Sequence, residues 1–194
     1  RVKMFGGDFI KIVLIGDNFD DAQKEAQKQI NENTIFIHPF DDSTVIEGQG
    51  TIALEILDQI DKHFDYLIIP IGGGGLISGM ITVFNKLSPK TKIIGVEASG
   101  APAMFRSIDQ KKIIELNKID NFVDGVSIKK IGKIPFEICK EHLDDLLVVP
   151  EGKICQTILD LYNKDGIVVE PAGAIGISAF EMYHKKFINK NIGI

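Results

Sequence analysis

A strand pattern and a helix pattern meet in the segment Tyr66-Leu67-Ile68-Ile69-Pro70-Ile71-Gly72-Gly73-Gly74-Gly75-Leu76. The residues before the glycines are apolar and partly β-branched, which is typical of a strand that is covered on both faces. Beyond the glycines, apolar side chains recur at the spacing of one helix face, at Leu76, Met80, Val83, Phe84 and Leu87. Four consecutive glycines therefore occupy a strand-to-helix junction.

Glycines at such a junction let backbone N–H groups turn toward a ligand, because no Cβ stands in the way. The helix behind them adds roughly half a positive charge at its N-terminus. We therefore predict an anion cup, most often a phosphate cup, over Gly72 to Gly75. The alternative is a tight turn with close helix–strand packing. One glycine would suffice for that turn, and each glycine costs up to ~1 kcal/mol of backbone entropy relative to alanine.

The spacing of the glycines argues against two common phosphate sites. A dinucleotide fingerprint needs glycines at i, i+2 and i+5, and no register of the Gly72–Gly75 run with Gly79 satisfies it. A P-loop ends in Gly-Lys-Ser/Thr, whereas Met80 follows Gly79. Nucleoside triphosphate binding is therefore not expected.

Composition limits the classes of function. The chain has 194 residues, of which 44% are hydrophobic, enough to bury the core of one domain, or of one domain and part of another. A net charge of −5 without a dense Lys/Arg tract argues against nucleic-acid and anionic-membrane partners. No apolar stretch approaches the ~20 residues of a membrane span. Cys139 and Cys155 lie on separate helix patterns, and we interpret them as reduced core residues.

Strand and helix patterns alternate along the chain, which is typical of an α/β fold with a mostly parallel sheet. We expect strands over residues 9–15, 34–37, 66–71, 92–97 and 146–149. We expect helices over about residues 19–31, 51–60, 76–87, 101–108, 134–143 and 154–162, and from 170 onward. The first residues are typical of a last helical turn closed by Gly6-Gly7, and the last four are typical of an opening strand. We therefore interpret the chain as a fragment of a longer protein.

Two carboxylates are candidates for chemistry. Glu97 ends a strand on the same side of the sheet as the glycine loop, where open α/β sheets bind ligands. Glu170 stands at a helix start after an apolar run, where we expect it to be part-buried and able to tune a nearby cofactor. Charge complementarity with the helix N-terminus explains Glu170 equally well.

Three further segments have simpler interpretations. The segment Gly48-Gln49-Gly50-Thr51 is either part of an active-site wall or a helix start. The pair Asp41-Asp42 is interpreted as solvated loop residues, because it lacks a partner at metal-ligand spacing. The four histidines, among them His38, form no ligand pair at helical spacing and are interpreted as surface or capping residues.

Several motifs together resemble one family. The segment Ile71-Gly72-Gly73-Gly74-Gly75-Leu76 is similar to the phosphate-binding loop of the fold-type II pyridoxal-phosphate enzymes, which have the tryptophan synthase β-like fold. The surrounding sequence resembles the threonine dehydratases (threonine ammonia-lyases), most closely the biosynthetic type. The matching motifs follow in the family's order: Gly16-Asp17-Asn18-Phe19-Asp20, His38-Pro39-Phe40-Asp41-Asp42, Gly48-Gln49-Gly50-Thr51, Gly95-Val96-Glu97-Ala98, Asp124-Gly125-Val126, Pro150-Glu151-Gly152-Lys153 and Glu170-Pro171-Ala172-Gly173-Ala174. They extend over essentially the whole chain.

The resemblance implies a two-domain α/β fold in which helices flank parallel sheets and pyridoxal 5'-phosphate binds in the cleft. Residues 1–38 would form the C-terminal part of the smaller domain, and residues 39–194 most of the larger, cofactor-binding domain. The backbone N–H groups of Gly72, Gly73, Gly74, Gly75 and Leu76 would hold the cofactor phosphate. The family's Schiff-base lysine lies upstream of this chain, so no catalytic residue is assigned here, and Glu170 stays a candidate auxiliary residue.

The implied reaction is the deamination of L-threonine to 2-oxobutanoate and ammonia, the first step of isoleucine biosynthesis, with L-serine as a slower substrate. The resemblance also implies a cytoplasmic homo-oligomer, a dimer or a tetramer. Serine dehydratase, serine racemase and a non-catalytic phosphate-ligand-binding relative remain alternatives.

Racemase-like relatives hold a divalent cation through a glutamate at the position of Glu97, a carbonyl near Ala101 and an aspartate at the position of Ala103. Alanine at that third position supplies no side-chain oxygen, and magnesium and calcium need about six or more oxygen ligands. We therefore expect no metal site, and we interpret Glu97 as a structural or helix-facing carboxylate.

Overall fold

The computed structural model describes residues 1–17 and 19–194. Asn18, which belongs to the motif Gly16-Asp17-Asn18-Phe19-Asp20, lies outside the described residues. The chain forms two compact units, Arg1–Phe36 and Ile37–Ile194. In neither unit do the described residues include a helix that is both long enough and apolar enough to cross a bilayer.

The first unit contains α1 (Val2–Gly6), the 3-10 turn η1 (Gly7–Phe9) and α2 (Phe19–Gln27). Gly7 closes α1 with a φ of 51°, which confirms the helix end predicted at Gly6-Gly7. The strands predicted over residues 9–15 and 34–37 are wrong. Residues 10–15 have no regular structure, and Thr34 makes only an isolated bridge with Asn31. A β-branched apolar pattern becomes a strand only when another strand pairs with it, and none in the described chain does.

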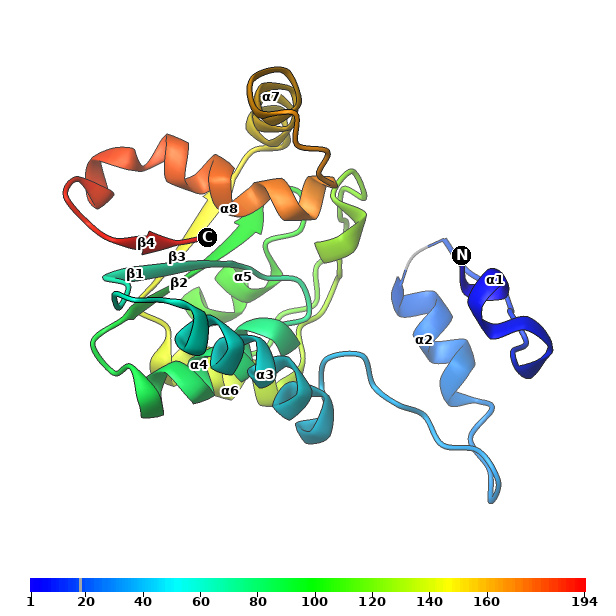
Figure 1. The fold of residues 1–194 in the computed structure, drawn as a ribbon. Coiled ribbons are helices and arrows are strands. Elements are labelled where there is room, and N and C mark those ends of the chain that lie inside the picture. The colour runs from blue at the N-terminus through cyan, green and yellow to red at the C-terminus, as the bar shows by residue number, and fades with distance from the viewer. Residues whose placement is uncertain (18) are drawn as a thin grey trace. The chain divides into compact units, whose positions relative to one another are not determined.

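The second unit is built on a four-stranded parallel sheet (Figure 1). Its strands are β1 (Tyr66–Pro70), β2 (Lys92–Ala98), β3 (Asp145–Val149) and β4 (Ile192–Gly193), in the order β3-β2-β1-β4. These strands confirm the α/β class and the predicted parallel sheet. The Ile71 N–H extends the β1–β2 pairing by donating to the Val96 carbonyl at 2.8 Å, so the sheet remains ordered up to the first glycine.

Helices flank this sheet on both faces (Figure 1). The helices and helical turns are α3 (Ser43–Gln59), α4 (Gly75–Leu87), α5 (Ala103–Asp109), η2 (Asp124–Val126), α6 (Lys133–His142), α7 (Glu151–Asp160), the π-helical turn η3 (Leu161–Asp165), α8 (Pro171–Met182) and η4 (His184–Phe187). Helix α8 crosses one face of the sheet, and α4 and α6 lie on the other (Figure 1). On the α8 face, Ile68, Ile94 and Val96 of the strands pack against Ala174 and Ile175 of the helix.

Helix α3 differs from its prediction, because it begins at Ser43 and not near Thr51. The segment Gly48-Gln49-Gly50-Thr51 therefore lies in the middle of a helix, and the expected helix start there is wrong. A Cβ on Gly50 would lie 3.3 Å from the Gly79 carbonyl oxygen of α4. These glycines thus allow α3 and α4 to pack closely.

The two cysteines are free thiols, as predicted. Cys139 is buried, and burial raises its thiol pKa to about 12, so it behaves as an apolar core residue. Cys155 is half-buried on α7.

Candidate functional site

The candidate site is the loop that connects β1 to α4. It follows the carboxyl end of β1, which is where open parallel sheets bind ligands. Gly74 is the N-cap residue of α4 and has a φ of 95°, a left-handed conformation that favours glycine. Gly74 and Gly75 are buried, and Gly72 and Gly73 are half-buried.

Six successive backbone N–H groups, those of residues 72–77, donate to no acceptor within the described part of the chain. The flanking N–H groups are satisfied, because Ile71 donates to Val96 and Ser78 donates to the Gly74 carbonyl at 3.1 Å. Gly74, Gly75 and Ile77 are buried, and buried N–H groups in native proteins are almost always paired, so an acceptor is expected here. Together with the positive end of α4, it forms a site whose chemistry fits an anion with several oxygens, such as a phosphate.

Each of the four glycines also lies close to another segment: a Cβ would collide with a neighbour at Gly72, Gly73 and Gly74 and would make a tight contact at Gly75. The neighbours of Gly72, Gly73, Gly74 and Gly75 are, in that order, Val126, Phe40, Pro135 and again Phe40. A Cβ on Gly74, for example, would lie 2.6 Å from the Pro135 Cβ. The expectation that close packing would need only one of the glycines is therefore wrong. The free N–H groups, and not the number of glycines, indicate the anion site.

The turn formed by residues 38–42 links the loop to two helices. The Asp42 carboxylate accepts the first N–H groups of α3, at 2.9 and 3.1 Å. The Asp41 carboxylate accepts the Ile134 N–H of α6 at 2.8 Å. The interpretation of this pair as solvated loop residues is wrong, because each side chain caps a helix N-terminus. Next to Asp41, the Gly132 N–H donates to the Gly73 carbonyl at 3.2 Å, so the start of α6 also holds the glycine loop.

Glu97 lies at the end of β2 and is almost fully buried. Its two carboxylate oxygens accept the N–H groups of Met104 at 2.8 Å and Phe105 at 2.7 Å, both in the first turn of α5. This geometry confirms that Glu97 faces a helix. Burial raises its pKa to about 8, and the two N–H donors partly oppose that shift. The Met104 side chain in turn lies beside Gly74, where a Cβ would be 3.2 Å from the Met104 Cε.

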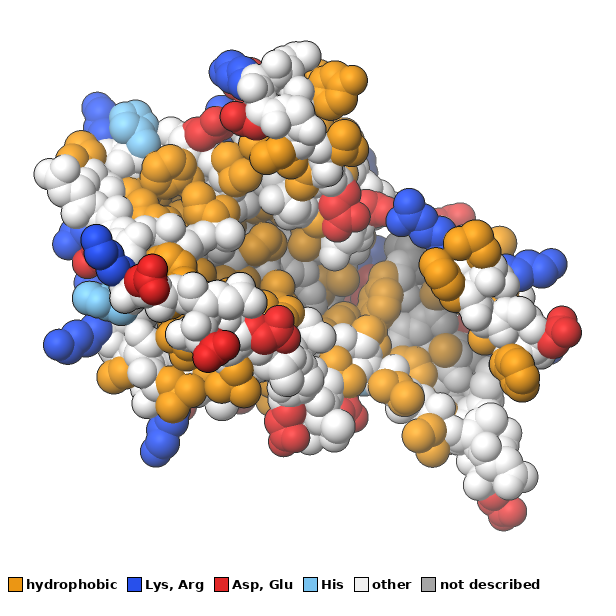
Figure 2. Space-filling view, in the orientation of Figure 1, with side chains coloured by type: hydrophobic (Ala, Val, Ile, Leu, Met, Phe, Trp, Pro, Cys, Tyr) orange, Lys and Arg blue, Asp and Glu red, His pale blue; other side chains and the backbone are white. Residues whose placement is uncertain are grey.

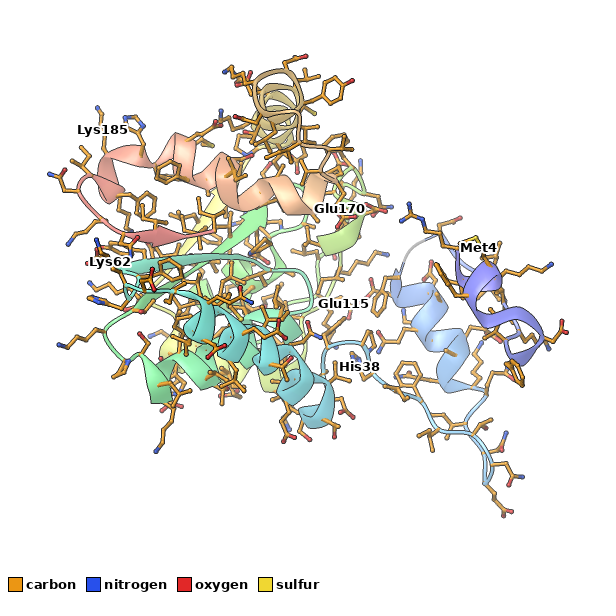
Figure 3. The ribbon with its side chains drawn as sticks, in the orientation of Figure 1. Met4, His38, Lys62, Glu115, Glu170 and Lys185 are labelled. Atoms are coloured by element: carbon orange, nitrogen blue, oxygen red, sulfur yellow. The ribbon has the colours of Figure 1, made fainter. Side chains whose placement is uncertain are left out.

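Glu170 is the N-cap residue of α8, with Pro171 following at the first helical position, as predicted (Figure 3). Its side chain is exposed, so the expectation that it is part-buried is wrong. A Cβ on Gly125 would lie 3.6 Å from the Glu170 Oε1. Glu170 therefore approaches the loop only indirectly, through η2, whose Val126 packs on Gly72.

Sequence reasoning missed the residues that hold the loop in place. Phe40, Pro135 and Met104 touch the glycines from three separate segments. These contacts join residues that are distant in the chain, so no local pattern reports them. The sequence marked His38 only as a surface or capping residue. The structure agrees with capping, since the His38 Nδ1 accepts the N–H groups of Phe40 and Asp41.

A parallel α/β sheet with an anion-binding glycine loop at its carboxyl edge defines a class of phosphate-ligand proteins. The chain matches the family described as pyridoxal-phosphate dependent enzyme over residues 1–193. It therefore belongs to the pyridoxal-phosphate dependent enzyme family.

Two bacterial relatives of this chain have the same name. The chain is 52% identical to the biosynthetic L-threonine dehydratase of Halalkalibacterium halodurans and 47% identical to that of Bacillus subtilis, in each case over 99% of this chain and 46% of the relative. The chain thus spans about half the length of the curated relatives it matches.

Solved structures agree with the fold. Threonine deaminase isoform 2 from Solanum lycopersicum has a TM-score of 0.87 and 38% identity, covering 99% of this chain and 53% of that one. Maize serine racemase has a TM-score of 0.88 and 30% identity, covering 100% of this chain and 59% of that one. The fold is therefore that of the fold-type II pyridoxal-phosphate enzymes.

Glu97→Gln tests the burial of this carboxyl group. The native pKa of about 8 exceeds the ordinary value of 4.5, so the native state keeps a proton that the unfolded state loses. Stability from Glu97 is fully present below about pH 4.5 and is lost as the pH rises toward 8, by up to ~1.4 kcal/mol per pH unit. We expect the urea midpoint of the full-length protein to fall less between about pH 5 and 8 in Glu97→Gln than in the wild type. Parallel pH profiles would contradict the shift.

Proposed function

We propose that the protein carrying this chain is a threonine ammonia-lyase that converts L-threonine to 2-oxobutanoate and ammonia, the first step of isoleucine biosynthesis. The observation that carries the proposal is the 47–52% identity to relatives named biosynthetic L-threonine dehydratase, extending over 99% of this chain. The family match and the likeness to a plant threonine deaminase support it.

Within this activity, the chain's role is to hold the cofactor phosphate with the N–H groups of Gly72, Gly73, Gly74, Gly75 and Leu76. The support is the run of N–H groups that have no acceptor among the described residues, which fits the several oxygens of a phosphate dianion. When bound, pyridoxal phosphate supplies a conjugated ring that withdraws electrons from the amino acid's Cα. The N–H groups orient that ring by fixing its phosphate. They also favour the doubly charged phosphate over its protonated form.

Glu170 has an auxiliary role in this proposal. Its carboxylate lies against η2, and η2 packs on the first glycine of the cup. Because Glu170 is exposed and touches the cup only through Gly125 and Val126, its removal should have a smaller effect than a change in the glycine loop.

The domain organisation and assembly are part of the same proposal. Residues 1–38 would complete a smaller domain and residues 39–194 would form most of the cofactor domain, a division supported by the two compact units. We further propose a homo-oligomer, dimer or tetramer, in the cytoplasm. Exposed apolar side chains on and after α7, where Figure 2 shows hydrophobic surface, support self-association: Leu159, Tyr162, Ile167 and Val168.

Serine racemization is the second candidate, since maize serine racemase shares the fold over the whole chain. The carboxylate geometry favours the lyase. Both oxygens of Glu97 are engaged by the first turn of α5, and Ala103, which begins that helix, has no ligand oxygen on its side chain. Besides Glu97, a divalent cation at this position would have only carbonyl oxygens and water as ligands.

The activity assay uses the full-length protein with L-threonine and L-serine, each with and without a chelator. We expect 2-oxobutanoate from threonine, slower pyruvate formation from serine, and rates unchanged by chelation. D-serine as the main product, or loss of activity on chelation, would show that the lyase proposal is wrong. Absence of any reaction with bound pyridoxal phosphate would favour a non-catalytic relative.

Gly74→Asp tests the phosphate cup. The substitution adds a side chain beside Pro135 and a negative charge where a dianion must bind, so we expect cofactor retention to be abolished. The matched control is Gly152→Asp, at a glycine of α7 with open space around it, which should retain the cofactor. The measurement is cofactor absorbance after gel filtration, with far-UV circular dichroism to confirm folding. A folded Gly74→Asp protein that keeps its cofactor would refute the assignment.

A further inference from the structure

We propose that His38 is a positioning residue for the glycine cup: its Nδ1 lone pair fixes the turn that presses Phe40 against the glycine loop. The proposal rests on the proposed assignment of that loop to the cofactor phosphate. Figure 3 shows His38 on the segment that leads into α3, where it begins the turn of residues 38–42.

The first step is the hydrogen bonding of the imidazole. His38 Nδ1 accepts the N–H of Asp41 at 2.9 Å and the N–H of Phe40 at 3.3 Å. Both partners are obligatory donors, so Nδ1 must carry a lone pair and the ring must be neutral, with its proton on Nε2. Asparagine and aspartate usually make this arrangement, in which a side chain accepts N–H groups two and three residues on. Pro39 fixes the φ of the turn between them.

The second step is the placement of Phe40. The His38 and Phe40 rings meet edge to face, with centroids 4.6 Å apart and planes at 82°. The Phe40 ring occupies the space where a side chain of Gly73 would project, and a Cβ on Gly75 would lie 3.0 Å from the Phe40 Cα. His38 therefore holds Phe40 through one hydrogen bond to its backbone N–H and one ring contact. Phe40 in turn covers two of the four glycines.

The third step reaches the other side of the loop through Asp41. The N–H of Asp41 is fixed by His38, and its carboxylate accepts the Ile134 N–H at the start of α6. That first turn of α6 holds the loop through Gly132, which donates to the Gly73 carbonyl, and through Pro135, which packs on Gly74. A single neutral imidazole thus orders both segments that define the shape of the cup.

Protonation of His38 would remove the acceptor and set an Nδ1–H against two N–H groups. Burial lowers the pKa of His38 below its ordinary value of 6.5, and the nearby charges of Asp41 and Asp42 partly oppose that shift. The folded cup therefore favours the neutral ring. Its contribution is fully present above pH 6.5 and is lost as the pH falls through the lowered pKa.

The experiment measures the pyridoxal phosphate dissociation constant of the full-length apoprotein at about pH 8 and at a series of lower pH values that passes below the ordinary histidine pKa and on through the lowered pKa of His38. The variants are His38→Ala, which removes the acceptor, and His38→Asn, whose Oδ1 replaces Nδ1 but does not titrate. The control is His184→Asn, the same change at an exposed histidine of η4.

We expect His38→Ala to bind the cofactor about tenfold more weakly than the wild type near pH 8, the scale of one or two lost hydrogen bonds. The difference should shrink as the pH falls, because protonation removes the same acceptor from the wild type. His38→Asn should bind like the wild type near pH 8 and lose less affinity than the wild type at low pH. The cofactor phosphate titrates in both proteins, so its effect on affinity cancels when the two are compared. His184→Asn should have the wild-type affinity at every pH.

Two results would overturn the proposal. One is wild-type affinity of His38→Ala near pH 8. The other is a His38→Asn protein that binds as weakly as His38→Ala near pH 8, or that keeps the wild-type pH profile. If His38→Ala does not fold, His38→Asn alone decides through its pH profile. A wild-type protein that binds no pyridoxal phosphate would instead refute the cup, and with it the function on which this proposal rests.

Discussion

Three chain segments pack directly against the backbone of the β1–α4 loop, and the structure of the second unit depends on this close approach. The turn at residues 38–42, the 3-10 turn η2 and the start of α6 all touch the β1–α4 loop where side chains would otherwise stand. Because the loop has no Cβ atoms, its carbonyls and Cα atoms can meet these segments directly. The result is a loop held by packing from three segments, whose N–H donors have no acceptor among the described residues.

The same four glycines thus serve two physical requirements. Packing explains why a side chain is absent from each position, since a neighbour occupies the space. The proposed binding of the cofactor phosphate would account for the N–H groups that have no acceptor in the described chain, since each buried donor left unpaired costs about 1–3 kcal/mol. The two requirements also reinforce each other, because a cup that binds a phosphate with several donors needs those donors held in fixed directions.

Local pattern sufficed to predict the elements around the loop. The segment from Tyr66 to Ala98 has a continuous apolar strand, a glycine junction, an amphipathic helix and a second strand, and each agrees with the structure within one or two residues. The predicted strands at residues 9–15 and 34–37 failed because strand formation depends on a partner that the pattern does not contain. The early start of α3 was missed because Gly48 and Gly50 look like helix breakers, while the Asp42 cap and the contact with Gly79 favour a helix.

The sequence predicted the N–H donors of the candidate site, but not the distant residues that hold the glycine loop in place. A strand, four glycines and a helix are adjacent in sequence, so the cup followed from local geometry. The contact of Asp41 with Ile134 joins residues far apart in the chain, and no periodicity reports it. Asp41 and Asp42 were interpreted as solvated for this reason, although both cap helices. Burial of Glu170 was overestimated because the apolar run before it is itself largely exposed.

A crystal structure of the full-length protein with pyridoxal phosphate tests the central claim most directly. The account predicts phosphate oxygens within hydrogen-bonding distance, about 2.7–3.2 Å, of the backbone nitrogens of Gly72 to Leu76. It also predicts that the loop moves little, because its supporting contacts already exist without the ligand. A phosphate bound elsewhere, with these N–H groups paired to water or to another protein segment, would contradict the account.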